Sequence, residues 1–243
     1  MTEPIVYSCV TAGYDKVAPV PTAWHCRFIL FHDGSVEVPD GWEGRRLHVA
    51  GLRGVALNRY AKMLPHRLGL EGELSLYVDG NIFFRRDPAE RIQSVLSKAK
   101  IAAFRHPHRE CAYAELRENL RLGFIGPGPV WRQVRKFRRA RLPRKSGLFE
   151  ARVLFRRHTE PEVVVLDELW WSMWQDGLGR DQPLLSAALW ATGMTVETVG
   201  PDARADPSDV LGVGEHATQR TRVQRLPKRL AAELALYRLW LPR

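Results

Sequence analysis

The sequence has no apolar run that approaches the ~20 residues a helix needs to span a bilayer. Its N-terminal stretch carries an acid, Glu3, where a signal peptide needs a basic region. Both absences predict a cytoplasmic protein. Cysteine is scarce as well: Cys9, Cys26 and Cys111 form an odd set without metal-ligand spacing, which predicts reduced, mostly buried thiols rather than a disulfide framework. Internal repeats and low-complexity tracts are absent.

Acidic residues are outnumbered: 27 Asp and Glu stand against 37 Lys and Arg, a formal net charge of +10 over 243 residues. This balance predicts an anionic partner, which can be nucleic acid, a nucleotide, an acidic glycan or a lipid surface. With 45% hydrophobic residues, the chain can bury a full core in one large domain, with or without an appendage.

The hydrophobic pattern alternates between short strands and helices through residue 199. Runs such as "IVYSCVT" (5–11) and "CRFILFHD" (26–33) have the length and composition of buried strands, and "LRGVALNRYAKML" (52–64) has helical spacing up to Pro65. A further helix is expected after "DP" at 87–88, with Asp87 as its N-cap. The alternation predicts an α/β fold in which helices cover both faces of the sheet.

Residues 200–243 differ in composition from what precedes them. Pro, Asp, Ala and Gly follow residue 199, and a last basic, amphipathic helix is expected over 227–241. We therefore expect a main domain of residues 1–199 and a C-terminal extension of residues 200–243. The apolar stripe of its helix would pack on that domain or on a second copy of the chain in a homodimer, and contact with a bilayer is the alternative.

One predicted strand, within "SLYVDGNIFFRRDP" (75–88), ends in a carboxylate and a carboxamide two residues apart, Asp79 and Asn81. Side chains at i and i+2 on a strand point to the same side, so the two can converge on one ligand; a plain turn at Gly80 is the alternative. Other predicted strands also end in polar residues, at 11–15, at Asp33 and at His106. Because ligands of α/β sheets lie at the carboxyl ends of strands, this convergence favours a ligand site over a turn.

Six segments, taken together, resemble a known family. They are "YSCVTAGYDKVAPV", "RYAKMLPH", "YVDGNI", "FRHPHRECAYAEL", "GLFEARVLFRRH" and "WWSMWQDGLGRDQPLLSAALW", and in this order they resemble the glycosyltransferase-like family long catalogued only as a domain of unknown function, whose better-known relatives are plant proteins connected with pectin and mucilage. The resemblance covers residues 5 to 195. It implies a GT-A type fold with a single mixed, mostly parallel sheet flanked by helices.

The same resemblance implies a chemistry. The expected activity is transfer of a sugar from a nucleotide-diphosphate sugar to an unidentified acceptor, which can be a glycan, a lipid-linked molecule or a small molecule. A divalent cation, Mn²⁺ or Mg²⁺, usually assists, because a hard cation neutralises the charge that builds on the departing diphosphate.

The expected metal ligands follow from the Asp-x-Asp motif of GT-A enzymes. Here "DGN" supplies Asp79 and Asn81, with one negative charge fewer, so the metal binds more weakly, needs a third ligand or is partly replaced by arginines. Glycogenin-like enzymes supply a late histidine ligand, and His216 in "GVGEHA" has the matching place. Gly80 would let a phosphate approach the backbone closely.

The first two predicted strands end in candidate donor-binding residues. Small residues in "TAGYD" let this loop pass near the nucleotide, which makes Thr11, Gly13 and Tyr14 donor-binding candidates; an ordinary tight turn is the alternative. Asp33 would accept a hydrogen bond from the base or ribose, although "DG" is equally a turn signal.

Cations and a histidine complete this set. Arg59 and Lys62 lie three residues apart on one helix face, where they either contact the diphosphate or remain solvated surface charges. His106, Arg109 and Glu115 stand in a segment that resembles the family's "HPxRxCxYxE". His106 is either a catalytic residue aimed at the site or a satisfied structural histidine, and Arg109 is expected to bind the donor.

The "RDQ" triplet at 180–182 supplies the remaining catalytic candidates. In glycogenin-like enzymes an Asp-Gln pair that opens the analogous helix contacts the donor sugar, so the resemblance assigns Asp181 and Gln182 to sugar binding or catalysis. Asp181 can also be a helix N-cap. A carboxylate would deprotonate the acceptor in an inverting enzyme, whereas a retaining one would depend on positioning, and the sequence leaves this open.

A rival function comes from "RQVRKFRRARLPRK" (132–145), which has eight basic residues and no acid. It would make the chain a non-catalytic binding module for nucleic acid or an anionic membrane. Only Phe137 interleaves as an aromatic, so stacking platforms are missing and no nucleic acid is expected; peripheral contact with the inner membrane face stays open. Among the tryptophans, Trp170 and Trp174 fit a core stripe, and Trp171 would point elsewhere and reach an acceptor.

Overall fold

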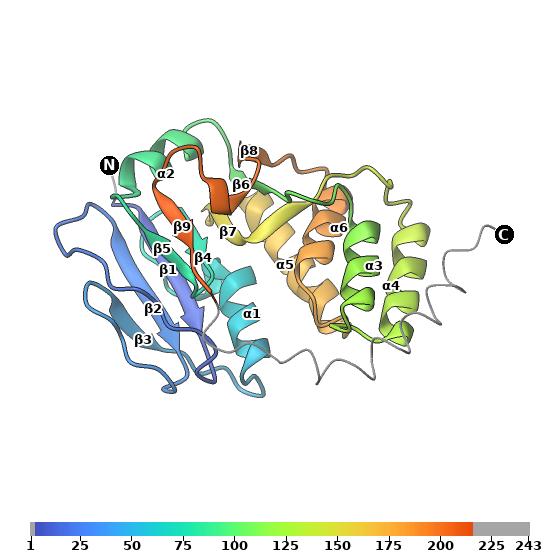
Figure 1. Ribbon diagram of the computed structural model, residues 1–243, viewed down its shortest axis with the longest axis horizontal. Coiled ribbons are helices and arrows are strands. Elements are labelled where there is room, and N and C mark those ends of the chain that lie inside the picture. The colour runs from blue at the N-terminus through green and yellow to red at the C-terminus, as the bar shows by residue number, and fades with distance from the viewer. Residues whose placement is uncertain (1–2, 216–243) are drawn as a thin grey trace.

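The computed structural model describes residues 3–215 (Figure 1). The helix expected over 227–241 and His216 lie outside the described residues. The described elements are, in chain order, β1 (Ile5–Val10), β2 (Arg27–His32), β3 (Glu43–Arg46), α1 (Val55–Met63), β4 (Leu74–Val78), β5 (Ile82–Phe84), α2 (Ala89–Leu96), β6 (Ile101–Arg105), α3 (Ala112–Arg121), α4 (Pro127–Arg139), β7 (Phe149–Arg157), α5 (Pro161–Gln175), α6 (Gln182–Thr192), β8 (Glu197–Gly200) and β9 (Leu211–Val213).

The main sheet has seven strands in the order β3-β2-β1-β4-β7-β6-β8. Strand β7 runs antiparallel to both of its neighbours, and every other neighbouring pair in this sheet is parallel. All six residues of β1 are buried, as expected for a strand whose two faces are both covered. The expected fold class, one mixed and mostly parallel sheet flanked by helices, is confirmed.

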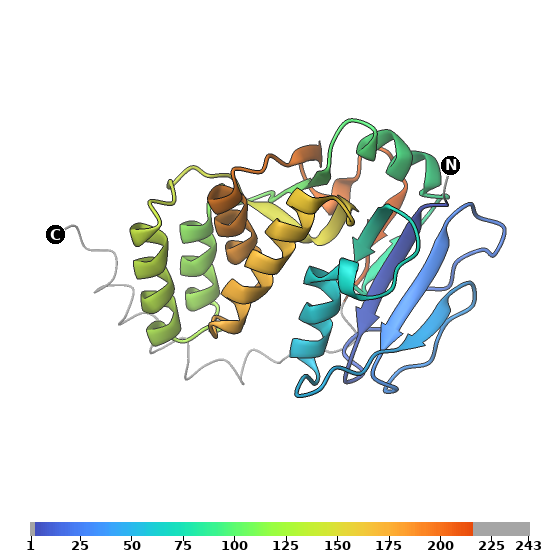
Figure 2. The same cartoon turned by 180° about the vertical axis from the view of Figure 1, so that it is seen from behind.

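Helices cover the two faces of the sheet unequally. One core joins alternate strand residues such as Tyr7 and Tyr77 to α1, α3, α4, α5 and α6, and the other joins Val6 and Leu76 to α2. Helices α5, α6, α3 and α4 lie side by side in one row, and α1 stands next to α5 (Figures 1 and 2). Successive side chains of each strand point to opposite faces of the sheet, so they belong to two separate hydrophobic cores.

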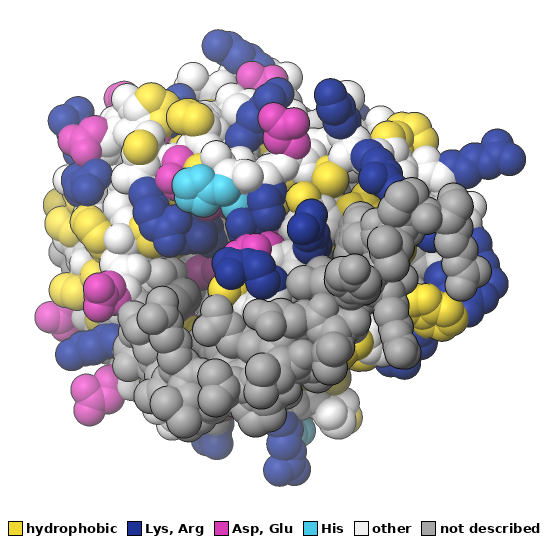
Figure 3. Space-filling view, turned by 45° about the vertical axis from the view of Figure 1, so that its right-hand side comes forward, with side chains coloured by type: hydrophobic (Ala, Val, Ile, Leu, Met, Phe, Trp, Pro, Cys, Tyr) yellow, Lys and Arg dark blue, Asp and Glu magenta, His cyan; other side chains and the backbone are white. Residues whose placement is uncertain are grey.

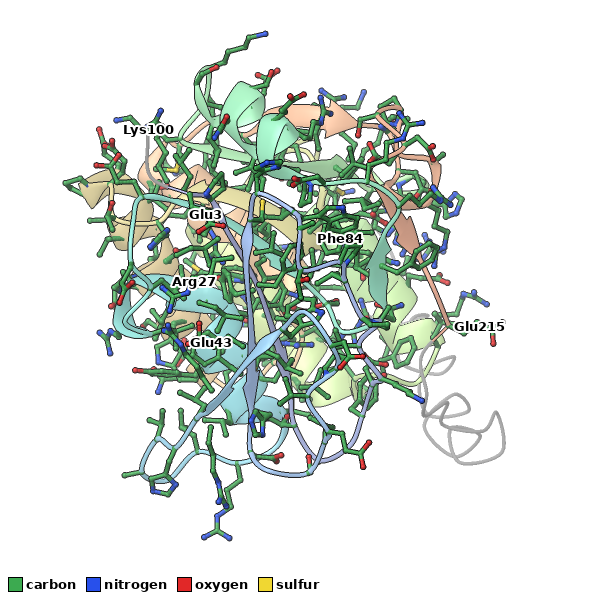
Figure 4. The ribbon with its side chains drawn as sticks, turned by 90° about the vertical axis from the view of Figure 1, so that its left-hand side faces the viewer. Glu3, Arg27, Glu43, Phe84, Lys100 and Glu215 are labelled. Carbon is green, nitrogen blue, oxygen red and sulfur yellow. The ribbon has the colours of Figure 1, made fainter. Side chains whose placement is uncertain are left out.

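The edges and ends of the fold agree with their local sequence. Edge strand β3 carries charged side chains, and its Glu43 pairs with Arg27 of β2 at 2.9 Å (Figure 4), which suits an exposed strand. The Asp87 carboxylate accepts the N–H of Ala89, the first residue of α2, at 3.0 Å, but the N-cap position is Pro88, one residue later than predicted. Strand β9 pairs with β5, so residues 211–213 lie against the main body of the fold.

Candidate functional site

Asp79 follows β4 directly and lies at the carboxyl end of the sheet. Its N–H donates to the carbonyl of Arg152 in β7 at 2.9 Å, which continues the ladder past the strand and fixes the turn. Its side chain is 27% exposed. Oδ1 accepts from the Tyr77 hydroxyl at 2.8 Å and lies 3.3 Å from Nζ of Lys62. The carboxylate is thus fixed by neighbours yet still open to solvent.

Lys62, from the last turn of α1, connects Asp79 with Asp181. Its side chain is 2% exposed, and Nζ lies 2.6 Å from Oδ2 of Asp181. The interpretation of Lys62 as solvated surface charge is therefore wrong, because helix spacing alone does not show that two distant carboxylates meet its ammonium group. Arg59, one turn earlier, places Nε 3.3 Å from the same Asp181 oxygen. The two cations do share one face of α1, as predicted.

Asp181 stands at the N-terminus of α6 and is almost fully buried. Burial by itself would raise the pKa of this carboxyl, but the positive charges of Arg59, Lys62 and Arg180 outweigh it and hold the pKa well below its usual range. Its side chain makes no capping hydrogen bond to α6, whereas its carbonyl accepts from Nε1 of Trp170 at 2.9 Å. The predicted cap position is correct, but the carboxylate faces the cations.

Several polar atoms around these carboxylates are buried without a hydrogen-bond partner among the described residues. They are Oδ1 of Asn81, Nε of Arg180 and Nε2 of Gln182. An unpaired buried polar atom costs roughly 1–3 kcal/mol, so three of them near one cluster indicate groups that a ligand would satisfy. The guanidinium of Arg180 also stacks over the ring of Phe124 at 4.9 Å.

The side-chain oxygens of Asp79 and Asn81 are candidate ligands for a divalent cation. Within residues 3–215 no group of three or more His, Cys, Asp or Glu comes together that could hold a metal ion. Asn81 donates through Nδ2 to the carbonyl of Gly214 at 2.9 Å, which leaves its buried Oδ1 as an oxygen donor. The alternative of a plain turn is what the backbone shows, since the N–H of Ile82 donates to the carbonyl of Asp79 at 3.0 Å. The Asp79 carboxylate and the Asn81 carboxamide oxygen are still donor types that suit Mg²⁺, which is commonly held by one or two carboxylates together with substrate phosphates and water.

Hydrogen bonds join the loop after β1 to the loop after β2 and to the residue before α1. Thr11 donates its hydroxyl to the carbonyl of Gly54 at 2.9 Å, and Asp33 accepts from the N–H of Ala12 at 2.9 Å. Burial by itself would raise the pKa of the Asp33 carboxyl. The hydrogen bonds that it accepts from Ser35 and Ala12 outweigh burial and lower this pKa overall. The N–H of Gly13 donates to Ser35 Oγ at 2.9 Å.

These contacts give part of the predicted donor loop an internal role. Gly80 is packed against Asp15, so the close approach seen there is that of a side chain rather than of a ligand. Tyr14 is 51% exposed beside the same loop. Donor binding by Thr11, Gly13, Tyr14, Asp33 and Gly80 stays a prediction.

His106, Arg109 and Glu115 are brought together in a second cluster after β6. Nε of Arg109 lies 2.5 Å from Oε2 of Glu115, and its Nη2 lies 2.8 Å from Nε2 of His106. Nδ1 of His106 accepts the backbone N–H groups of His108 and Arg109 at 3.1 Å. Burial and then Arg109 lower the pKa of His106 to about 4, so the ring is neutral at pH 7.

A bulge interrupts the pairing of β7 with β6. Ala103 of β6 pairs with Leu154 of β7, but Arg105 pairs with Phe149, so β7 has more residues than β6 between these two pairs. Bulges redirect side chains near functional sites, and this one carries Arg152, whose backbone holds Asp79 and whose charge acts on His106. Glu150 of β7 is buried and accepts the N–H of Ala203 at 3.1 Å.

Some parts of this region were missed or misplaced by sequence reasoning. Trp171 is buried and packs edge-on against Tyr60 at 5.7 Å, so the expectation that it points away toward an acceptor is wrong. The roles of Tyr77 and Arg180 were not foreseen, although each lies within two residues of a predicted site residue.

Comparison with known proteins gives a family model and a set of solved structures. The model described as "TOD1/MUCI70, glycosyltransferase-like domain" matches residues 56–190. No curated protein sequence matches the chain.

Three of the similar structures are glycosyltransferases by their titles. The galactosyltransferase LgtC with donor and acceptor sugar analogues has a TM-score of 0.47 at 11% identity, over 99% of this chain and 97% of its own. The apo form of GlyE from Streptococcus pneumoniae TIGR4 scores 0.46 at 9% identity, over 98% and 63%. Mouse xyloside xylosyltransferase 1 scores 0.37 at 10% identity, over 79% and 81%.

Proposed function

Because this chain belongs to the TOD1/MUCI70 glycosyltransferase-like family, we propose that it transfers a sugar from a nucleotide-diphosphate sugar to an acceptor hydroxyl. The observation that carries the proposal is Lys62, a buried ammonium between Asp79 at a strand end and Asp181 at a helix start. A buried Lys with two carboxylates from distant parts of the chain is costly to assemble, and such groups concentrate at functional sites.

The cations would act on the leaving group. Arg59, Lys62 and Arg180 surround Asp181, so this region holds three positive charges against the two carboxylates of Asp79 and Asp181. A diphosphate that departs from the anomeric carbon gains negative charge, and cations fixed beforehand in a partly buried site stabilise that charge at little reorganisation cost. Nε of Arg180, which has no hydrogen-bond partner among the described residues, supports this role.

Asp181 and Gln182 would bind the donor sugar. Because its pKa is held low, Asp181 stays ionised and is a weak proton acceptor, so it suits hydrogen bonding to sugar hydroxyls better than removal of the acceptor proton. Nε2 of Gln182, for which residues 3–215 supply no hydrogen-bond partner, would donate to the same sugar. This supports positioning rather than general-base catalysis by Asp181.

Asp79 and Asn81 would hold a Mn²⁺ or Mg²⁺ ion that arrives with the nucleotide. When bound, such a cation supplies charge neutralisation at the diphosphate. Asp79 would orient it, and the buried carboxamide oxygen of Asn81 would gain the partner that it lacks among the described residues.

The test is the Asp79→Ala variant, assayed for donor binding by calorimetry and for donor hydrolysis or transfer. A screen of nucleotide sugars by thermal shift first identifies the donor, since a ligand that binds only the folded state raises the melting temperature. We expect activity to fall about 10²-fold or more, the loss typical for one electrostatic group. The fold should persist, because Lys62 keeps its 2.6 Å contact with Asp181.

Asp176→Ala is the matched control, since Asp176 is an exposed carboxylate that also pairs with a lysine, Lys136, at 2.8 Å. This variant should keep full activity. Unchanged activity in Asp79→Ala, with a normal melting temperature, would contradict the proposal. Absence of binding for every nucleotide sugar and nucleoside diphosphate, with and without Mn²⁺, would contradict it as well.

A further inference from the structure

Helix α4 and the turn after it present a surface that the proposed transferase site does not use. Val130, Val134 and Phe137 face the core, so the opposite side of the helix faces solvent. We call the exposed basic residues of this segment the basic face. They are Arg132, Arg135, Lys136, Arg138, Arg139, Arg141, Arg144 and Lys145.

The charges of the basic face are almost entirely unpaired. Lys136 pairs with Asp176 at 2.8 Å, and among the described residues no carboxylate lies within ion-pair distance of the other seven. Elsewhere on the surface arginines do find carboxylates, as Arg27 does with Glu43 and Glu71. Figure 3 turns the end of the molecule that carries α4 toward the viewer, and Lys and Arg side chains are visible along its right-hand side beside hydrophobic ones. Unpaired like charges repel, so this face is suited to an anionic surface.

Exposed indoles flank the basic face. Trp131 of α4 is 47% exposed, and the guanidinium of Arg135 lies 4.5 Å from its ring centre. Trp190 of α6 is 48% exposed and donates its N–H to the carbonyl of Ala140 at 3.2 Å, just past the end of α4. The basic face thus lies between two partly exposed tryptophans.

We propose that the basic face docks this protein on an anionic lipid surface. Clusters of four to eight Lys and Arg at a bilayer bind acidic headgroups, and tryptophan is enriched at the level of the headgroups. The geometry is less suited to nucleic acid, because one ring face of Trp131 is already covered by Arg135 and is not open for a base to stack on. Docking would be peripheral, since within residues 3–215 no helix is long and apolar enough to cross a bilayer.

The experiment is sedimentation of the full chain with vesicles of phosphatidylcholine alone and of phosphatidylcholine mixed with phosphatidylglycerol. The test variant reverses three charges, Arg132→Glu, Arg135→Glu and Arg139→Glu. The matched control makes the same change in net charge at exposed residues elsewhere, Arg53→Glu, Lys98→Glu and Arg204→Glu. Melting temperatures confirm that both variants fold.

We expect the wild type to bind the mixed vesicles, to release them as salt rises and to ignore phosphatidylcholine alone. Each basic residue near such a surface contributes about fivefold, so the test variant should bind on the order of a hundredfold more weakly while the control keeps most of its affinity. Trp131→Ala should bind the mixed vesicles more weakly than the wild type, and this difference should be larger at high salt.

Three results would overturn the proposal: no binding to the mixed vesicles at low salt, an equal loss in the control, or tighter binding to a DNA or RNA oligonucleotide that the test variant abolishes. Donor binding, measured in parallel, should not change in the test variant, because the basic face shares no residue with the Asp79, Lys62 and Asp181 cluster. Failure here therefore leaves the proposed function untouched.

Discussion

At Gly80 there is no room for a methyl group. A Cβ at this position would lie 2.8 Å from Cβ of Asp15 and 2.8 Å from Cγ2 of Val10, closer than real Cβ atoms come to their neighbours. The glycine lets the turn after β4 pack against the loop after β1. The loop after β1 and the turn after β4, both of which would lie beside a bound nucleotide, therefore pack closely only because residue 80 has no side chain.

We predict that Gly80→Ala lowers the free energy of unfolding by about 1–3 kcal/mol, the cost of overpacking a tight interior, and weakens donor binding. Urea denaturation measures the first effect and calorimetry the second. Ser172→Ala is the control, because Ser172 is an exposed residue inside α5, where alanine has the higher helix propensity. Equal stability of Gly80→Ala and wild type would contradict the packing argument.

At the scale of elements, a buried ion pair and its hydrogen bonds join four of them, β7, α5, β1 and α1, under the candidate site. Arg156 of β7 donates to both oxygens of Asp167 in α5, at 3.0 and 3.1 Å. Its other terminal nitrogen donates to the hydroxyl of Tyr7 in β1 and to the carbonyl of Lys62 at 2.7 Å. The guanidinium thus binds a carbonyl at the C-terminal end of α1. This carbonyl belongs to Lys62, whose ammonium group contacts Asp79 and Asp181.

We predict that Asp167→Leu alone costs about 3–5 kcal/mol in unfolding free energy, because it leaves a buried guanidinium uncompensated. The double variant Arg156→Met with Asp167→Leu should cost clearly less than the sum of the two single changes, since it removes both charges. Urea denaturation of the four proteins completes the cycle. Additive single effects would show that the pair is not coupled.

The whole molecule should lose stability in acid partly through buried histidine. Burial and then Arg156 lower the pKa of His158 from 6.5 to about 4. The unfolded chain therefore takes up a proton near pH 6.5 that the folded chain takes up only near pH 4, and stability present at neutral pH is lost as the pH falls through this window. His106 acts in the same direction.

We predict that His158→Leu loses less unfolding free energy than the wild type between pH 6.5 and about pH 4, by at most about 3 kcal/mol. Urea denaturation at several pH values measures the difference. His48→Gln, a change at an exposed histidine, is the control and should follow the wild-type profile. Identical profiles for His158→Leu and wild type would rule out this contribution.

The division expected at residue 199 stays a proposal at this scale. Beyond it, Asp209 pairs with Arg85 at 2.9 Å and Leu211 is buried, so the described part of the extension is joined to the main domain by a strand pair and by charges. We propose that residues 200–215 complete the fold rather than form a separate unit.

The sequence by itself determined the strands, their alternation with helices, the polar strand ends and the family. These are local properties: a buried run must be apolar, and a strand that ends at a ligand edge must turn polar there. Asp79 was singled out in this way, and its functional role stays a prediction. The resemblance carried by "RDQ" was found in the same way, because it lies in one short stretch of chain.

Only the tertiary structure decided where the long charged and aromatic side chains lie. Lys62 and Asp181 are separated by 119 residues, and nothing near Lys62 in the chain distinguishes it from a solvated lysine. Trp171 was misplaced for the same reason, since Tyr60 from another helix covers it. Whether a charge is buried depends on whether a partner repays its loss of hydration, and that partner is chosen by the packing of distant elements rather than by neighbouring residues.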